Sequence, residues 1–283
     1  MAKRELESAP ARTLVIASGK GGATKSTAAV SLAAAFALGH ATQKTTNTPS
    51  RKPLRTLTIC LDGQANAAQW LLQNDGDPYA AGVADILTKT ATIIDTVQGS
   101  SIEGLDVLPP GPIDEVSEWM VGQRASELLI RDRIIRPLQE ANAYDIIVID
   151  TPPAIGQILV GALVASDGVA LAIRASDPNS PAGARDVLLL LEELSALGTG
   201  TPIGYLLGDV PPRPSATQKA VSEYAQRLGV PSLGEWPRSE AFPNGAAQGI
   251  PVPVGWPNSK ATTAIQNSAT LIWNTLKKKG KKQ

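Results

Sequence analysis

Two residue types that build common protein sites are nearly missing from this chain of 283 residues, which has one cysteine, Cys60, and one histidine, His40. A lone cysteine excludes an intramolecular disulfide, and the pair is too small for a Cys/His zinc site. No apolar stretch approaches the roughly 20 residues that cross a bilayer. The opening segment MAKRELESAPAR is polar and carries two acids. We therefore expect no signal peptide and a cytoplasmic location.

Charge is also scarce, and it is balanced. Only 18% of the residues are charged, with 26 basic and 26 acidic side chains, while 43% are apolar. This composition excludes a disordered chain, and the length is ample for a buried core. The balance hides one local excess, because the chain ends in LKKKGKKQ.

Short apolar runs rich in β-branched residues alternate with helical patterns along the chain. The runs predict strands at 13–18, 57–61, 105–109, 145–150, 168–174 and 203–208. The patterns predict helices at 26–38, 122–142, 179–197 and 215–228, and a last helix from near Ser259. Continuous apolar strands separated by helices indicate an α/β fold, with a mostly parallel twisted sheet covered by helices on both faces.

We expect one domain over residues 12–276, preceded by a flexible N-terminus at 1–11 and followed by a basic tail at 277–283. Residues 40–53 are polar and lack periodicity, so they predict a surface loop. In the first predicted helix, the apolar face is formed by Val30, Ala33, Ala34 and Ala37.

A glycine-rich segment joins the first predicted strand to this helix. It consists of Gly19, Lys20, Gly21, Gly22, Ala23, Thr24, Lys25, Ser26 and Thr27. The segment is close to the P-loop pattern G-x-x-x-x-G-K-[ST], in which small residues let backbone N–H groups face phosphate oxygens at a helix N-terminus. We predict that Lys25 binds the β and γ phosphates, Ser26 ligates Mg²⁺ and Thr27 binds the α phosphate. A plain glycine-rich turn is the alternative.

Thr24 stands where the pattern has its second glycine. If the loop requires a positive φ at this position, a β-branched residue costs about 1–3 kcal/mol. The sequence therefore predicts either a strained loop or one that has adapted to threonine.

The run Lys20-Gly21-Gly22-x-x-Lys25-Ser26-Thr27 resembles the deviant Walker A loop of the ParA/MinD family of ATPases, KGGxGKTT. The resemblance implies that the loop binds ATP with Mg²⁺. It also implies that Lys20 reaches across a nucleotide-sandwich homodimer to the partner's phosphates, where it acts as an arginine finger does. Hydrolysis of ATP to ADP and phosphate would then be weak until a partner and DNA stimulate it. A solvated loop lysine is the alternative for Lys20.

Two aspartates at predicted strand ends extend the resemblance. Asp62 matches the second aspartate of the family's DxDPQGN segment, which orients the attacking water, although Cys60 and Gly63 replace its first Asp and its Pro. The alternative for Asp62 is a cap on the helix that follows it. Asp150 ends DIIVID, which resembles Walker B, and the resemblance implies that it holds Mg²⁺ through a water. Cys60 is expected to be a buried core residue.

The residues that contact the base are less defined by the sequence. Glu235–Ser239, which includes Pro237 and Arg238, looks like the family segment ending in IPRS that closes over the base. Asp209 is placed to accept a hydrogen bond from the adenine amino group, and a helix-capping or solvated aspartate is the alternative. The preference for ATP over GTP rests on the resemblance.

The end of the chain carries five lysines, Lys277, Lys278, Lys279, Lys281 and Lys282. They predict a non-specific, salt-sensitive contact with DNA phosphates, with a frayed solubilising tail as the alternative. Residues 277–283 have no apolar side chain, which argues against a membrane anchor. Further basic candidates for a DNA-binding face are Arg174, Arg185, Lys219 and Arg227.

The resemblance implies a ParA-like partition ATPase that segregates a plasmid or chromosome. ATP would drive homodimerisation, the dimer would bind non-specific double-stranded DNA at the nucleoid, and a ParB-like centromere-binding protein would stimulate hydrolysis. The alternative is a MinD-like, membrane-associated ATPase or one that positions a protein cargo. A metallocluster ATPase of the same fold is a further rival, against which the lack of additional cysteines argues.

Overall fold

The structure of the protein, a computed structural model, describes residues 10–42, 52–73 and 76–279. Residues 1–9 of the predicted flexible N-terminus at 1–11, most of the predicted loop and the last four residues lie outside these ranges. Among the described residues, no helix is both long and apolar enough to cross a membrane.

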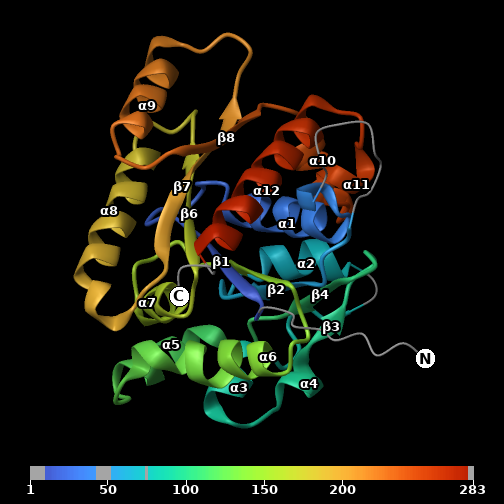
Figure 1. Cartoon of the computed structure of the whole chain (residues 1–283), viewed down its shortest axis with the longest axis vertical. Coiled ribbons are helices and arrows are strands. Elements are labelled where there is room, and N and C mark those ends of the chain that lie inside the picture. Colours follow the sequence, from blue (N-terminus) through green and yellow to red (C-terminus); the bar gives the residue numbers. More distant parts are fainter. Residues whose placement is uncertain (1–9, 43–51, 74–75, 280–283) are drawn as a thin grey trace.

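An eight-stranded sheet with the order β3-β4-β2-β5-β1-β6-β7-β8 forms the centre of the molecule (Figure 1). Its strands are β1 Arg12–Ala17, β2 Thr56–Cys60, β3 Gln98–Gly99, β4 Leu105–Leu108, β5 Ile146–Asp150, β6 Gly168–Arg174, β7 Thr201–Val210 and β8 Ser232–Pro237. All described neighbours pair in parallel except β3 and β4. The predicted mostly parallel sheet is confirmed.

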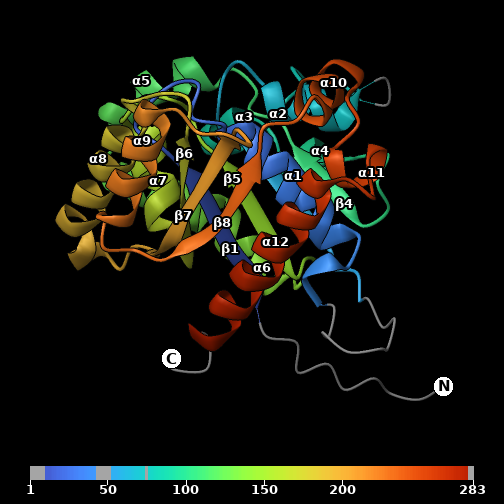
Figure 2. The same cartoon turned by 90° about the horizontal axis from the view of Figure 1, so that it is seen from above.

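Helices cover both faces of the sheet, as the sequence predicts (Figures 1 and 2). They are α1 Lys25–Ala37, α2 Asn66–Leu72, α3 Val83–Thr88, α4 Ile93–Thr96, α5 Ile113–Val121, α6 Arg136–Glu140, α7 Gln157–Val164, α8 Ser180–Glu193, α9 Ala216–Gln226, α10 Ala241–Gln248, α11 Val252–Gly255 and α12 Lys260–Lys279. One core layer packs α1, α2 and α12 on the sheet, and the other packs α3, α5, α7, α8 and α9.

The central position of β1 explains its apolar sequence and the burial of α1. Strand β1 lies between β5 and β6, and its side chains are buried in both core layers, Leu14 and Ile16 in one and Val15 and Ala17 in the other. Helix α1 is buried nearly all round, because α2 and α12 pack over it as well as the sheet. The predicted apolar face with Val30 and Ala33 is therefore only part of the buried surface, which also includes Leu32 and Phe36.

The predicted helix at 122–142 is wrong as one continuous element. Helix α5 already ends at Val121, and Gly122 follows as its cap. A short 3₁₀ helix at 126–128, a π-helical turn at 131–135 and then α6 take up the rest. Ala125 has a φ of 51°, a left-handed conformation that interrupts a helix.

The predicted loop at 40–53 also needs correction at its start. His40–Thr42 forms a 3₁₀ turn in which His40 is buried. The hydroxyl of Thr270 in α12 donates to the carbonyl of His40 at 3.2 Å. This part of the segment is therefore core, and residues 43–51 lie outside the described residues.

Candidate functional site

The glycine-rich segment forms a loop between the carboxyl end of β1 and the first residue of α1. The sheet register pairs Ile16 in β1 with Asp150 in β5, and Asp150 with Cys60 in β2. These three strands therefore end in one row, and the loop and both predicted aspartates lie at that edge. In open α/β sheets, ligands bind in the crevice at this edge.

Backbone conformation in the loop matches what a phosphate cradle needs. Gly22 has a φ of 73° and Thr24 a φ of 65°. Thr24 therefore occupies the left-handed region, where a β-branched residue is strained. No described side chain caps the N-terminus of α1, so its first N–H groups are available to an anion.

Lys25 is the buried cation of the loop. Lys25 is only 6% exposed, and the Lys25 Nζ donates to the carbonyl oxygen of Lys20 at 2.9 Å. Burial lowers the pKa of the Lys25 ammonium, and the nearby Asp150 and Asp62 oppose that shift. A buried cation with a single backbone partner has donors left for phosphate oxygens.

Lys20, in contrast to the buried Lys25, is partly exposed and forms an ion pair. Its Nζ is 3.8 Å from a carboxylate oxygen of Asp177, and the Lys20 side chain is 41% exposed. Lys20 and Gly19 do not line the cavity that the rest of the loop lines. The amide of Gly19 instead donates to the carbonyl of Gly183 in α8 at 2.9 Å.

Asp150 is a buried carboxylate without a normal hydrogen bond. It is 1% exposed, and neither of its oxygens has a partner of regular geometry among the described residues. Burial raises its pKa to about 7, although the Ser26 hydroxyl and the Lys25 ammonium oppose the shift. The described residues contain no group of three or more His, Cys, Asp or Glu side chains that could hold a metal ion. An unsatisfied carboxylate near a loop hydroxyl fits a hydrated Mg²⁺ that phosphate oxygens also hold.

Asp62 follows the end of β2 and lies near Asp150 and Lys25. Its Oδ1 accepts from the amide of Gln64 at 3.0 Å and so stabilises the turn after the strand. The cap of α2 is Ala65, and no side chain caps that helix. The alternative of Asp62 as a helix cap is therefore wrong. Cys60 is 1% exposed, as predicted, and burial raises the pKa of its thiol.

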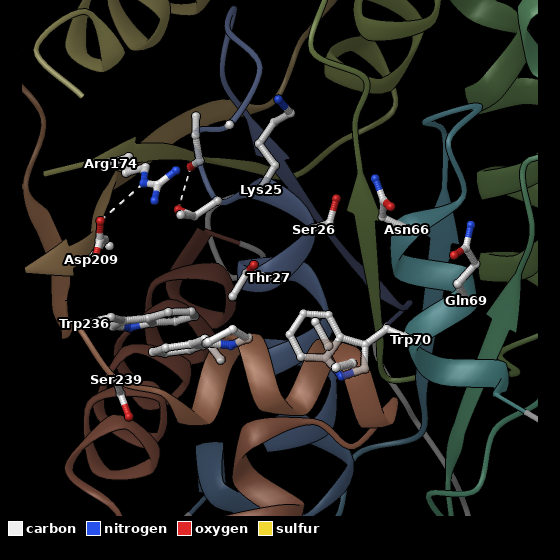
Figure 3. Close-up of a pocket in the computed structure, with 18 of the residues that line it drawn as sticks. Lys25, Ser26, Thr27, Asn66, Gln69, Trp70, Arg174, Asp209, Trp236 and Ser239 are labelled. Carbon is white, nitrogen blue, oxygen red and sulfur yellow. Dashed lines mark hydrogen bonds and ion pairs between the residues drawn. The ribbon is translucent and has the colours of Figure 1, made fainter. Parts of the chain in front are cut away.

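The loop opens on a cavity of about 1130 Å³, shown in Figure 3. One end is formed by the ends of β7 and β8, and the other by the side chains of α2; α10 lies between them. Several lining residues were not predicted from the sequence, among them Gln69, Trp70 and Gln73. Helices α2 and α10 are seven and eight residues long, too short to give a clear helical period.

At the β7–β8 end, Asp209 is neither a helix cap nor a solvated residue. Its carboxylate accepts from Arg238 Nε at 2.6 Å, from Arg174 Nε at 3.3 Å and from the hydroxyl of Ser176. Burial alone would raise the pKa of Asp209, but these three donors outweigh it and hold the pKa below its usual value. Arg174, a basic candidate for the DNA-binding face, also lines the cavity, and its side chain is 46% exposed. Pro237 and Arg238 lie at the predicted place beside the cavity.

The predicted basic tail is partly helical. Lys277 and Lys278 are exposed in the last turn of α12, and the Lys277 ammonium lies 5.5 Å from the ring centroid of Trp273. Lys279 ends the helix, its side chain is not described, and Lys281 and Lys282 lie outside the described residues. A Cβ at Gly168, the first residue of β6, would meet Leu276. The end of α12 therefore packs at the amino ends of the strands, opposite the cavity.

Together, the central parallel strand, the phosphate loop and the acidic residues on adjacent strands define a P-loop nucleoside triphosphatase. A protein-family model described as an AAA domain matches residues 11–197. The chain is 29% identical over 164 residues to the sporulation initiation inhibitor protein Soj of Bacillus subtilis, an alignment that covers 58% of each protein. It is 30% identical over 164 residues to the chromosome partitioning protein ParA of Myxococcus xanthus, covering 58% of this chain and 52% of that one.

The chain thus belongs to the AAA domain family and, within it, to the ParA/MinD family of P-loop ATPases. The matched region spans little more than half the length of these two curated relatives.

Solved structures share the fold over nearly the whole chain. A Cyanothece McdA variant in complex with ATP superposes with a TM-score of 0.77 at 20% identity, covering 96% of this chain and 97% of that one. The cell division ATPase MinD of Pyrococcus furiosus gives 0.71 at 20% identity, with 93% and 99% covered. Cobyrinic acid a,c-diamide synthase of Mycobacterium smegmatis with ADP and magnesium gives 0.74 at 19% identity, with 94% and 96% covered. Since these proteins carry different names on one fold, the fold alone does not select the function.

Proposed function

We propose that this chain binds and hydrolyses ATP with Mg²⁺, dimerises when ATP is bound, and acts as a DNA partition ATPase. The observation that carries the proposal is the different placement of the two loop lysines. Lys25 is buried and lines the cavity, while Lys20 lies outside it and is 41% exposed. This difference supports a role for Lys25 at the chain's own nucleotide and a role for Lys20 at a second subunit.

The chain's own residues divide the work of hydrolysis. Lys25 and the N–H groups at the start of α1 hold the phosphates. Ser26 and Asp150 would hold Mg²⁺, directly and through a water, and the bound ion would neutralise charge on the phosphates. Asp62, at the end of β2 beside Asp150, would orient the attacking water. Lys20 of a second copy would complete the charge neutralisation.

Substrate and base recognition are assigned to the other end of the cavity. Pro237 and Arg238 flank the position proposed for the base, and Asp209 braces this end through its ion pairs with Arg174 and Arg238. Asp209 Oδ1 accepts one hydrogen bond from the protein, from Arg238 Nε, so one lone pair remains for an adenine amino group.

DNA and a ParB-like protein are the proposed partners, and the nucleoid in the cytoplasm is the proposed location. The identity to Soj and ParA supports this choice, since the ParA relative is named as a chromosome partitioning protein. Two basic surfaces are candidates for DNA: the end of α12 with Lys277 and Lys278, and exposed Arg185 and Lys219 on α8 and α9. Arg227 is a weaker candidate, because it pairs with Glu223 at 3.8 Å.

Binding of the full chain to a random duplex DNA in ATP·Mg²⁺, and then in ADP·Mg²⁺, tests this function. We expect binding in ATP that weakens in ADP and at higher salt, and none for Lys25→Ala in either nucleotide. Equal binding in ATP, in ADP and without nucleotide would contradict a nucleotide-controlled DNA partner. ATP-dependent binding to anionic vesicles without DNA binding would favour the MinD-like alternative instead.

A further inference from the structure

The ammonium of Lys20 is held against the turn that precedes α8. It lies 3.8 Å from Asp177 Oδ2, and the side chains of Lys20 and Asp177 are 41% and 29% exposed. The other oxygen, Asp177 Oδ1, accepts from the amide of Asn179 at 2.9 Å. The carboxylate is therefore fixed to its own turn, while the long lysine side chain is the partner that can move.

The backbone of Lys20 is held in the same region. Its carbonyl accepts from Lys25 Nζ at 2.9 Å. A Cβ at Gly183 in the first turn of α8 would lie 3.0 Å from Lys20 Cβ and 3.1 Å from Lys20 N. The glycine thus allows α8 to approach the loop closely. Lys20 is restrained at both ends, by Lys25 at its carbonyl and by Asp177 at its ammonium.

The turn between β6 and α8 also reaches the far end of the cavity. The hydroxyl of Ser176 donates to Asp209, and the amide of Arg174 donates to Ser180 Oγ at 2.8 Å. Asp177 is the next residue after Ser176. The same short turn therefore contacts the ion-pair cluster at the β7–β8 end and the lysine of the phosphate loop.

We propose that Asp177 is a positioning residue, which holds the Lys20 ammonium against α8 and so opposes dimerisation until ATP is bound. This inference rests on the proposed function, because it requires that Lys20 acts on a second subunit. Phosphate oxygens compete with the Lys20 carbonyl for the Lys25 ammonium, which weakens one restraint. Lys20 then exchanges the single carboxylate of Asp177 for the more highly charged phosphates of the partner's nucleotide. A half-exposed ion pair is weak, so the restraint is reversible.

The variant Asp177→Asn tests the inference, because asparagine keeps the acceptor for the Asn179 amide and removes only the charge. The protein concentration at half-dimerisation in ATP·Mg²⁺, measured by light scattering, should fall by three- to fivefold, about 1 kcal/mol at most. Asp186→Asn is the matched control. Asp186 lies on the exposed side of α8, makes no ion pair with any described residue, and carries the same charge close to the loop.

A second comparison separates positioning of Lys20 from a general structural effect. In a Lys20→Ala background, adding Asp177→Asn should leave the dimerisation midpoint unchanged, because the restrained side chain is gone. A midpoint unchanged or raised by Asp177→Asn alone, or an equal shift in the Lys20→Ala background, would overturn the inference. If the wild-type chain forms no dimer at all in ATP, the proposed function fails, and that result is distinct from a failure of Asp177.

Discussion

The ammonium of Lys25 donates a hydrogen bond to the backbone carbonyl of Lys20 across the phosphate loop, at 2.9 Å. The two lysines that matter most to the proposed chemistry are thereby connected through the loop. Because phosphate oxygens compete with the Lys20 carbonyl for the Lys25 ammonium, we expect nucleotide binding to weaken this hydrogen bond. The proposed restraint on Lys20 would then depend on the nucleotide.

Substitution of Lys20 separates binding from turnover. Lys20→Ala should leave ATP affinity nearly unchanged, because Lys20 does not line its own cavity, and should abolish hydrolysis. Calorimetry measures the first quantity and phosphate release the second. For the wild type, turnover per chain should rise with protein concentration as dimers form. Unchanged turnover in Lys20→Ala, independent of protein concentration, would show that the cross-subunit role is wrong.

Substitution of Asp62 isolates the attacking water. Asp62→Ala should bind ATP and dimerise but not turn over, since the phosphate contacts of Lys25 and Ser26 remain. The expected product is a long-lived, DNA-bound dimer, seen as slow dissociation from immobilised duplex in ATP. Asp62→Ala also removes the hydrogen bond from the Gln64 amide. The control is Asp62→Asn, which keeps an acceptor for that amide and should be equally inactive. Rapid hydrolysis by either variant would restrict Asp62 to stabilising the turn.

The side chain of Thr24 packs closely against Gly208 at the cavity. Thr24 has a φ of 65°, and a Cβ at position 208 would lie 3.0 Å from its Oγ1. Thr24→Gly should relieve the backbone strain and tighten ATP binding by up to about tenfold, about 1.4 kcal/mol. Gly208→Ala should weaken binding by pushing Thr24 into the loop, and much less so in the Thr24→Gly background.

Fluorescence titration with a labelled ATP analogue measures all four proteins of this cycle. Weaker binding by Thr24→Gly would mean that the loop has adapted to the threonine side chain, through its hydrogen bond to the carbonyl of Ala23. Additive effects in the double variant would mean that Thr24 and Gly208 do not interact.

Deletion of residues 277–283 tests the basic tail. It should weaken binding to random DNA without altering ATP hydrolysis in the absence of DNA, because the end of α12 lies opposite the cavity. If all five lysines contact phosphates, the slope of log affinity against log salt should fall by about 4 to 5 units. A fall of about 1 to 2 would assign most of the contact to the folded surface. Replacing the same lysines with glutamine, which leaves the last turn of α12 in place, is the control, and an unchanged slope in both proteins would contradict the role of the tail.

The phosphate side of the site is predictable from the sequence because it depends on local patterns. The buried runs that form β1, β2 and β5 have strongly β-branched sequences, and the predicted and observed strands agree within a residue or two. Since these strands are parallel neighbours, the residues at their carboxyl ends necessarily meet. This places the loop, Asp62 and Asp150 together without any knowledge of side-chain contacts.

The contacts made through distant segments are not predictable in this way. Asp177 lies 157 positions from Lys20, and their ion pair depends on how α8 approaches the loop at Gly183. Nothing in the local sequence around Arg174 indicates its partner. The strand order β6-β7-β8 brings Arg174 beside Asp209. The helices α2 and α10 have too few residues for a periodic signal, so the part of the cavity wall that they form was not predicted.

Calorimetric titration of ATP·Mg²⁺ into the wild-type chain and into Lys25→Ala tests the central claim most directly, because Lys25 is the buried cation of the cavity. We expect one nucleotide bound per wild-type chain and loss of measurable binding in the variant, with both proteins folded by circular dichroism. Equal ATP affinity in a folded Lys25→Ala protein would contradict the assignment of this loop as the phosphate site.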